Sequence, residues 1–254
     1  MDLDSLAVAM LACAAVALLA VLGVRFAGLI GIPGLLLYLG LGLVIGWIFP
    51  QYDLQDAQLA TVLGYAALVV ILAEGGLTTR MDNLRPVLWP ALVLATAGVA
   101  IRIAIVTFAL VSLTDVTLQM ALLIGAVVAA TDAAAVFSVL RRLRLHPRLR
   151  SLLEGEAGFN DAPVVVLVVV LSSGDIAALS PWQVPLIVIA ELIGGAAFGI
   201  AVGLGARYLL PRLALPSVGL YPIAVMSFMA LAYGAASVAH TSGFMAVYIA
   251  GVLV

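Results

Sequence analysis

Long apolar runs separated by short polar clusters make up this chain. About 20 helical residues cross the roughly 30 Å hydrocarbon core of a bilayer, so each long run predicts a spanning helix. The alternating ten-residue segments of a membrane β-barrel do not appear. We therefore predict an all-α, polytopic transmembrane helical bundle in a single domain over residues 1–254. The predicted helices cover 6–24, 31–49, 59–78, 86–113, 118–140, 151–172, 183–207 and 218–239, and a ninth run begins near Ser242 and reaches Val254.

Composition supports a membrane protein and excludes several other classes. Apolar residues make up 65% of the 254 residues, charged residues 9%, and the mean hydropathy is +1.29. Soluble domains carry about 25% charged residues, so disordered and nucleic-acid-binding classes do not fit. The single cysteine, Cys13, cannot form an intramolecular disulfide. The acidic start, with Asp2 and Asp4, lacks the basic region of a signal peptide and predicts a retained first helix.

The arginines predict how the helices are oriented. The chain has no lysine, and ten of its eleven arginines fall in the loops after the first, third, fifth and seventh predicted helices. Because translocation is biased against positive charge, we place these loops in the cytoplasm and the N-terminus outside a cell membrane. The loop at residues 141–150 holds five of these arginines, and a binding patch for nucleic acid or lipid is the alternative interpretation. Membrane topology explains the five arginines without a ligand. The ten are Arg25, Arg80, Arg85, Arg141, Arg142, Arg144, Arg148, Arg150, Arg207 and Arg212.

Several charged residues lie inside the apolar runs. Each costs at least about 2.5 kcal/mol at mid-membrane, so such residues normally face an interior or a watery cavity. Five acids against one arginine is an excess of negative charge that suits a cation pathway. At about 1.5 Å per residue, Asp132 and Asp161 both reach the bilayer midplane, where alternating-access transporters keep their site. The set is Arg102, Glu74, Asp132, Glu156, Asp161 and Glu191.

Oxygen ligands for a monovalent ion accompany both aspartates. Thr131 precedes Asp132 in a segment of small residues, and its hydroxyl and carbonyl are oxygen ligands for a hard cation. Pro163 lacks an N–H, so it leaves the carbonyl of Phe159 without its helical partner beside Asn160 and Asp161. A proline kink with a capped carbonyl is the simpler alternative for this second segment.

These two segments, residues 131–138 and 154–161, together resemble the paired signature of the NhaP-type monovalent cation/proton antiporters, and most closely their bacterial potassium/proton branch. The resemblance covers the whole chain and implies a transmembrane transporter domain with the first inverted repeat of a sodium/proton-antiporter-like fold and part of the second. It implies that Asp161 alternately binds a proton and a cation, that Asn160 orients the site, and that Asp132 with Thr131 shapes it at an unwound helix.

The resemblance also assigns two glutamates. Glu74, late in the third helix, would lie near a cytoplasmic funnel, and Glu156 would form a structural ion pair with an arginine of the second repeat. In this family such an arginine follows the part matched by residues 1–254, so we expect Glu156 to face a vacant groove or water, and we expect the chain to be a fragment. Ala157 replaces a serine common in the family, and Ala133 replaces a common proline. The family further implies a homodimer, no cofactor and no nucleic-acid partner.

The predicted function is antiport, with no enzymatic activity. Proton and K⁺ or Na⁺ would compete for Asp161, and one neutral neighbour, Asn160, suggests one-for-one exchange. An intramembrane aspartyl protease is an alternative, but its Gly-x-Gly-Asp signature is not met at residues 158–161. A cation channel is another alternative, separated by flux that is not coupled to protons. His146 and His240 are expected to be interfacial polar residues, since no His-Glu-x-x-His motif exists.

Overall fold

A computed structural model describes residues 3–30, 34–48, 57–79, 81–131, 136, 140, 143, 145–172 and 183–254. Within these ranges the regular structure is helical, without a strand. The elements are α1 (Leu3–Ile30), α2 (Gly34–Ile48), α3 (Ala57–Thr78), α4 (Met81–Leu84), η1 (Arg85–Val87), α5 (Leu88–Val93), η2 (Leu94–Gly98), α6 (Val99–Leu113), α7 (Leu118–Ala129), α9 (Pro147–Ser172), α10 (Gln183–Leu209), η4 (Leu210–Arg212), α11 (Leu220–Val238) and α12 (Gly243–Leu253).

Helix length and hydropathy confirm the polytopic membrane class. Five helical stretches of the described residues are long and apolar enough to cross a bilayer: Ala57–Thr78, Met81–Leu113, Pro147–Ser172, Gln183–Arg212 and Leu220–Val238. They correspond to the predicted runs 59–78, 86–113, 151–172, 183–207 and 218–239. The ninth run also begins where it was predicted, because Ser242 is the N-cap of α12 and accepts a hydrogen bond from the Met245 backbone N–H at 3.3 Å.

Two predicted helices differ from the structure in their regularity. The run 118–140 was predicted as one helix, but α7 ends at Ala129, and Ala130 has the extended dihedrals φ −61° and ψ 133°. The run 86–113 begins earlier, at Met81, and contains a π-helical turn at Leu94–Gly98. The pattern of apolar residues predicts neither the early end of α7 nor the π-helical turn, since a bilayer span stays apolar whether its backbone is α-helical or locally unwound.

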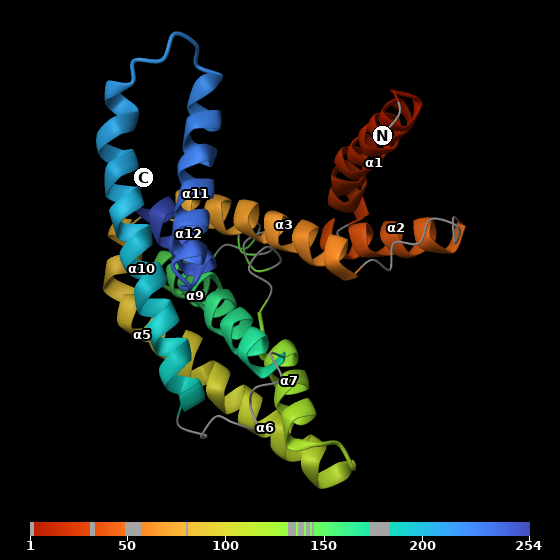
Figure 1. The fold of residues 1–254 in the computed structure, drawn as a ribbon, viewed down its shortest axis with the longest axis vertical. Coiled ribbons are helices and arrows are strands. Elements are labelled where there is room, and N and C mark those ends of the chain that lie inside the picture. Colours follow the sequence, from red (N-terminus) through yellow and green to blue (C-terminus); the bar gives the residue numbers. More distant parts are fainter. Residues whose placement is uncertain are drawn as a thin grey trace. The chain divides into compact units, whose positions relative to one another are not determined.

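The chain divides into two compact units, Met1–Val62 and Leu63–Val254. In the first unit α1 packs against α2. In the second unit α9 is the central helix, because α4, η1, α5, η2, α7, α10 and α12 all pack against it (Figure 1). More than half of its most apolar window, 56%, is buried, compared with 17–28% for the other four candidate spans. The polar residues of α9 therefore lie in the interior of this unit.

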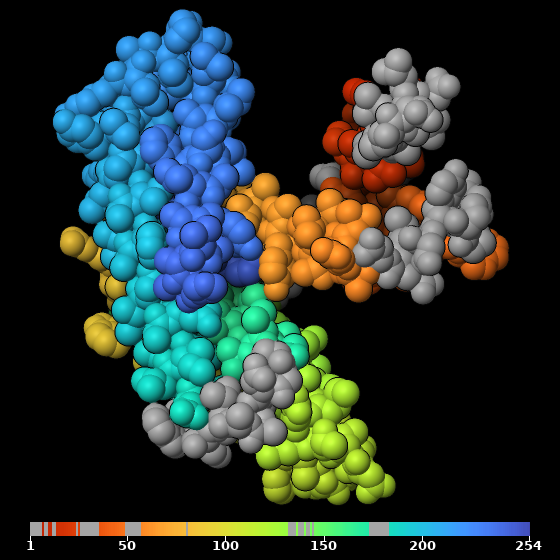
Figure 2. Space-filling view, viewed as in Figure 1, coloured from red at the N-terminus to blue at the C-terminus, as the bar shows by residue number. Residues whose placement is uncertain are grey.

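Small residues bring α10, α11 and α12 together. Gly195, Gly199 and Gly203 recur every four residues along α10 and lie against α12, where a Cβ on Gly199 would come within 2.6 Å of the Ala246 carbonyl oxygen. Helices in lipid associate by such close backbone approach, since apolar side chains gain little from leaving apolar tails. Figure 2 shows α10 and α11 packed side by side, and α11 also contacts α12.

Candidate functional site

Asn160 and Asp161 lie in the buried middle of α9. Asn160 has no exposed surface and Asp161 is 9% exposed. The helix runs unbroken from Pro147 to Ser172 with Pro163 inside it, and a proline at this position cannot donate to the carbonyl of Phe159. The structure therefore places an amide, a carboxylate and a carbonyl without its helical N–H donor within one turn of a buried helix.

The end of α7 brings Thr131 to the same place. Gln119, at the start of α7, donates from Nε2 to the Leu171 carbonyl near the end of α9 at 2.9 Å, so the two helices run antiparallel. α7 then ends at Ala129, level with Asn160, and the Asn160 Nδ2 donates to the Thr131 Oγ1 at 2.5 Å. Two segments about thirty residues apart in the sequence, each predicted to hold site residues, thus meet through a direct hydrogen bond.

The carbonyl oxygen of the Asn160 side chain is not used by the bond to Thr131. Among the described residues, Asn160 Oδ1 is a buried acceptor without a hydrogen-bond partner. An unsatisfied buried polar atom costs about 1–3 kcal/mol, and native structures keep few of them without a water, ion or functional reason. An amide oxygen beside a carboxylate is the kind of hard ligand that alkali cations prefer.

Two of the acids inside the apolar runs, Glu74 and Glu191, lie on other helices than this pair. Asp132 lies outside the described residues, so its position relative to Asp161 stays a prediction. Glu74 lies on an exposed face of α3, where the Thr78 hydroxyl donates to its carbonyl oxygen at 2.8 Å. Glu191 lies half-buried on α10, and its carbonyl oxygen accepts from the Ser242 N–H at 3.0 Å.

The predicted surroundings of Glu156 were wrong. Sequence reasoning left Glu156 facing a vacant groove, with its arginine partner expected beyond residue 254. In the structure its Oε1 pairs with Nη2 of Arg102 on α6 at 3.0 Å, and the side chains are 13% and 37% exposed. The sequence does contain a signal for this pairing, because Arg102 is the one arginine inside an apolar run and intramembrane charges normally pair with one another.

The ion pair joins the π-helical span to the site helix. Arg102 follows the turn Leu94–Gly98 by one helical turn, and Glu156 precedes Asn160 by four residues on α9. Val99 and Ile103 of α6, Ala126 and Ala129 of α7 and Val164 of α9 form a small apolar cluster nearby in the same three helices. The π turn and the glycine stripe of α10 were also missed, although the stripe is visible in the sequence as glycines at 195, 199 and 203.

The two histidines lie at the surface, and in the sequence they lie apart from Asn160 and Asp161. His146 and His240 are both exposed, and His146 Nδ1 accepts from the Arg148 backbone N–H at 3.3 Å. In the part of the chain that the structure describes, no group of three or more histidine, cysteine or acidic side chains could hold a metal ion. What the site offers chemically is a buried carboxylate next to neutral oxygen ligands.

Comparisons with known proteins show which family this chain is similar to. The model of the sodium/hydrogen exchanger transmembrane family matches residues 14–254. A K⁺/H⁺ antiporter NhaP2 of Shewanella sp. strain MR-4 is 38% identical, over 99% of this chain and 44% of its own length. A K⁺/H⁺ antiporter NhaP of Alkalimonas amylolytica is 32% identical, over 93% of this chain and 42% of its own length. This chain therefore spans less than half the length of these relatives.

A solved structure supports the fold. The sodium proton antiporter MjNhaP1 from Methanocaldococcus jannaschii superimposes with a TM-score of 0.74 at 28% sequence identity. The match covers 96% of this chain and 61% of that one. The sodium/proton-antiporter-like fold inferred from the paired motifs is thereby confirmed.

Proposed function

Because the chain belongs to the sodium/hydrogen exchanger family, we propose that the protein exchanges a monovalent cation for protons across the membrane, and that the two compete for Asp161. The observation that carries the proposal is the hydrogen bond from buried Asn160, next to Asp161 on the central helix, to the partly buried Thr131. Among the described residues of this arrangement, Asp161 is the ionisable group, and Asn160 and Thr131 supply neutral oxygen atoms beside it. No enzymatic step is needed for this function.

The mechanism follows from the cost of moving charge through lipid. A bare carboxylate at mid-membrane is expensive, so the protein changes between inward- and outward-facing states only when a proton or a cation neutralises Asp161. Asn160 contributes no charge, and the Arg102–Glu156 pair is neutral as a unit. One charge therefore moves in each direction, and exchange is electroneutral at one proton for one cation.

Two finer assignments belong to the same proposal. K⁺ is favoured over Na⁺ as the substrate, since the relatives that match nearly the whole chain are named K⁺/H⁺ antiporters. The protein resides in the cell membrane with its arginine-rich loops in the cytoplasm, because those loops carry ten of the eleven arginines. Asp132 completes the ion site from the segment after Thr131, and Glu74 lines the cytoplasmic approach. The homodimer implied by the family resemblance stays a prediction.

Competition between proton and cation gives a specific test. The full-length protein, reconstituted in liposomes, should show an apparent K⁺ affinity that weakens about tenfold for each pH unit once the site is mostly protonated, by mass action at one group. Raising the K⁺ concentration should move the pH of maximal rate to more acidic values. Na⁺ measured in the same vesicles reports the selectivity. A cation affinity that stays constant over this pH range would show that the proton and the cation bind different groups.

A further inference from the structure

We propose that Tyr248 of α12 is a positioning residue for the ion site, because its ring fixes the backbone of α9 directly before Asn160 and Asp161. The inference rests on the proposed function, since its consequence is a change in apparent cation affinity. Tyr248 lies nearly ninety residues after Asp161 in the sequence and belongs to neither of the motifs that identify the site. Its role follows from contacts made only in the folded chain.

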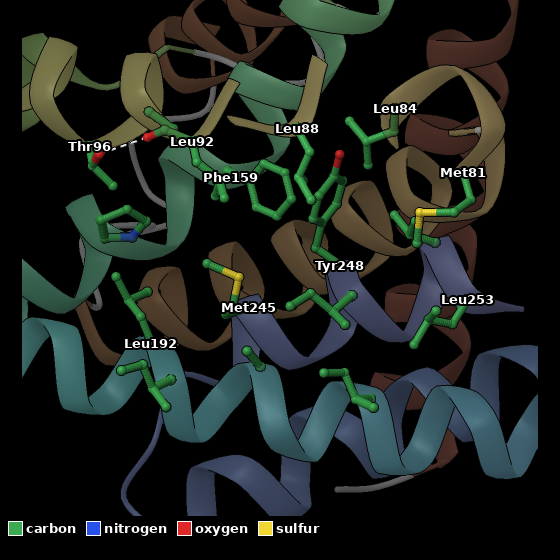
Figure 3. A pocket seen from close by; sticks show the side chains of 17 residues that line it. Met81, Leu84, Leu88, Leu92, Thr96, Phe159, Leu192, Met245, Tyr248 and Leu253 are labelled. Carbon is green, nitrogen blue, oxygen red and sulfur yellow. Dashed lines mark hydrogen bonds between the residues drawn. The ribbon is translucent and has the colours of Figure 1, made fainter. Parts of the chain in front are cut away.

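The ring of Tyr248 is pressed against α9. Tyr248 has no exposed surface and is the largest fully buried side chain of the described residues. A Cβ on Gly158 would lie 2.3 Å from its Cε2 and Cζ atoms, so only glycine lets the two helices approach this closely. The ring also packs edge-on against Phe159, with centroids 5.1 Å apart and planes at 80°. Figure 3 shows the two rings side by side.

α3 also comes close to the backbone of α12 near Tyr248. A Cβ on Gly76 of α3 would lie 2.6 Å from the carbonyl oxygen of Tyr248, and one on Gly251 would lie 3.1 Å from the Gly76 Cα. The backbone of α12 at Tyr248 therefore has a close neighbour in α3, in addition to the contact of its ring with α9. Close-packed interfaces of this kind transmit displacement instead of absorbing it.

An apolar cavity shows why the ring matters for Phe159. A cavity of about 460 Å³ lies among α4, α5, η2, α9, α10 and α12, and both Phe159 and Tyr248 line it, with Leu92, Leu192 and Met245 among the other lining residues (Figure 3). Phe159 borders this cavity on one side and the Tyr248 ring on another, so the edge-on contact with Tyr248 helps to set its position. Phe159 immediately precedes Asn160, and its carbonyl is the one that Pro163 leaves without a helical donor.

The aromatic ring, and not the hydroxyl, carries this role. The Tyr248 Oη is buried without a hydrogen bond among the described residues. Thr79 lies close enough to interact with it, but the Thr79 hydroxyl donates to the Gly75 carbonyl at 2.7 Å and forms no bond of standard geometry with the tyrosine. Phenylalanine should therefore replace Tyr248 without loss, whereas an aliphatic side chain should not.

The first experiment compares transport by the full-length protein and three variants in liposomes. Tyr248→Leu should raise the apparent KM for K⁺ by about tenfold, since ligand displacements well below 1 Å weaken a preorganised site. Tyr248→Phe should keep the original KM. Met229→Ala, at an equally buried position on α11, removes a larger volume and should lower the Tm while leaving KM unchanged. An unchanged KM in Tyr248→Leu, or equal defects in the Leu and Phe variants, would overturn the proposal.

A second experiment reads the contact without transport. Gly158→Ala should lower the Tm by about 5 °C in the unmodified protein, and by much less in the Tyr248→Leu background, where the smaller side chain leaves room for the methyl group. Equal losses in both backgrounds would overturn the contact on which the proposal rests. Absence of any cation/proton exchange in the unmodified protein would instead overturn the proposed function, so the two failures are distinguishable.

Discussion

The helices α9 and α10 are both long and apolar enough to cross the membrane, but they differ in how many polar residues they carry and in how deeply they are buried. α9 carries Glu154, Glu156, Asn160 and Asp161 and is the most buried of the candidate spans. The charged residues of α10 are Glu191 and, in the last turn, Arg207, and only 17% of the most apolar window of this span is buried. In water a helix hides its apolar face, whereas in lipid the polar helix is the one that needs an interior.

The two helices are also held by different contacts. α9 is tied to its neighbours by polar bonds, from Asn160 to Thr131 and from Glu156 to Arg102, in addition to its apolar packing. α10 is held against α12 by the glycines at 195, 199 and 203, which allow backbone contact. We therefore expect changes in α9 to affect transport first and changes in α10 to affect stability first. The four predictions below test this difference.

The largest effect should come from the carboxylate of α9. Asp161→Asn removes the titrating group while keeping the shape of the side chain, so exchange should be abolished in protein that is inserted and folded. The matched control is Glu191→Gln on α10, which should leave exchange close to the original rate. Transport in liposomes and the elution profile in detergent check both variants. Proton-coupled exchange that persists in folded Asp161→Asn would assign the proton to Glu74 or Asp132.

The glycine stripe of α10 should show the opposite pattern. Gly199→Ala places a methyl group 2.6 Å from the Ala246 carbonyl oxygen, and such overpacking costs about 1–3 kcal/mol. Gly205→Ala on the same helix meets nothing within 4 Å, and should be neutral or stabilising by up to about 1 kcal/mol. Thermal unfolding in detergent measures both changes. Equal Tm values for the two variants would contradict the close contact between α10 and α12.

The ion pair should have an intermediate effect. Arg102→Gln leaves the Glu156 carboxylate, which is 13% exposed, without its partner, and should cost about 1–2 kcal/mol of stability. Adding Glu156→Gln to the Arg102→Gln variant should recover most of this loss of stability, because it removes the unpaired charge. The coupling between the two positions comes from a double-mutant cycle on Tm. Additive losses would show that Arg102 and Glu156 do not stabilise each other.

The smallest effect should come from the hydroxyl that meets Asn160. Thr131→Val keeps the side-chain shape but removes the acceptor of the Asn160 Nδ2 hydrogen bond. The amide then loses its fixed orientation, so apparent K⁺ affinity should fall by about three- to tenfold, as expected for one hydrogen bond. Thr131→Ser keeps the acceptor and is the control. An affinity unchanged by the valine would remove Thr131 from the proposed ion site.

The sequence by itself determined the class of the protein and the positions of most of its spans. Bilayer thickness fixes the length of an apolar run, so the spans at 59–78, 151–172, 183–207 and 218–239 follow from hydropathy alone. The cost of intramembrane charge likewise points to a small set of residues that includes Asp161, and the two motifs identify the antiporter-like fold that the solved structure supports.

Tertiary structure decided which residues meet. The break after Ala129, the hydrogen bond from Asn160 to Thr131 and the pairing of Arg102 with Glu156 all join segments whose separation in the chain carries no information about distance. The contact of Tyr248 with Gly158 is of the same kind. Hydropathy reports how each segment partitions into lipid, a property of one helix at a time, whereas ion pairs, ligand oxygens and close glycine contacts depend on how several helices pack.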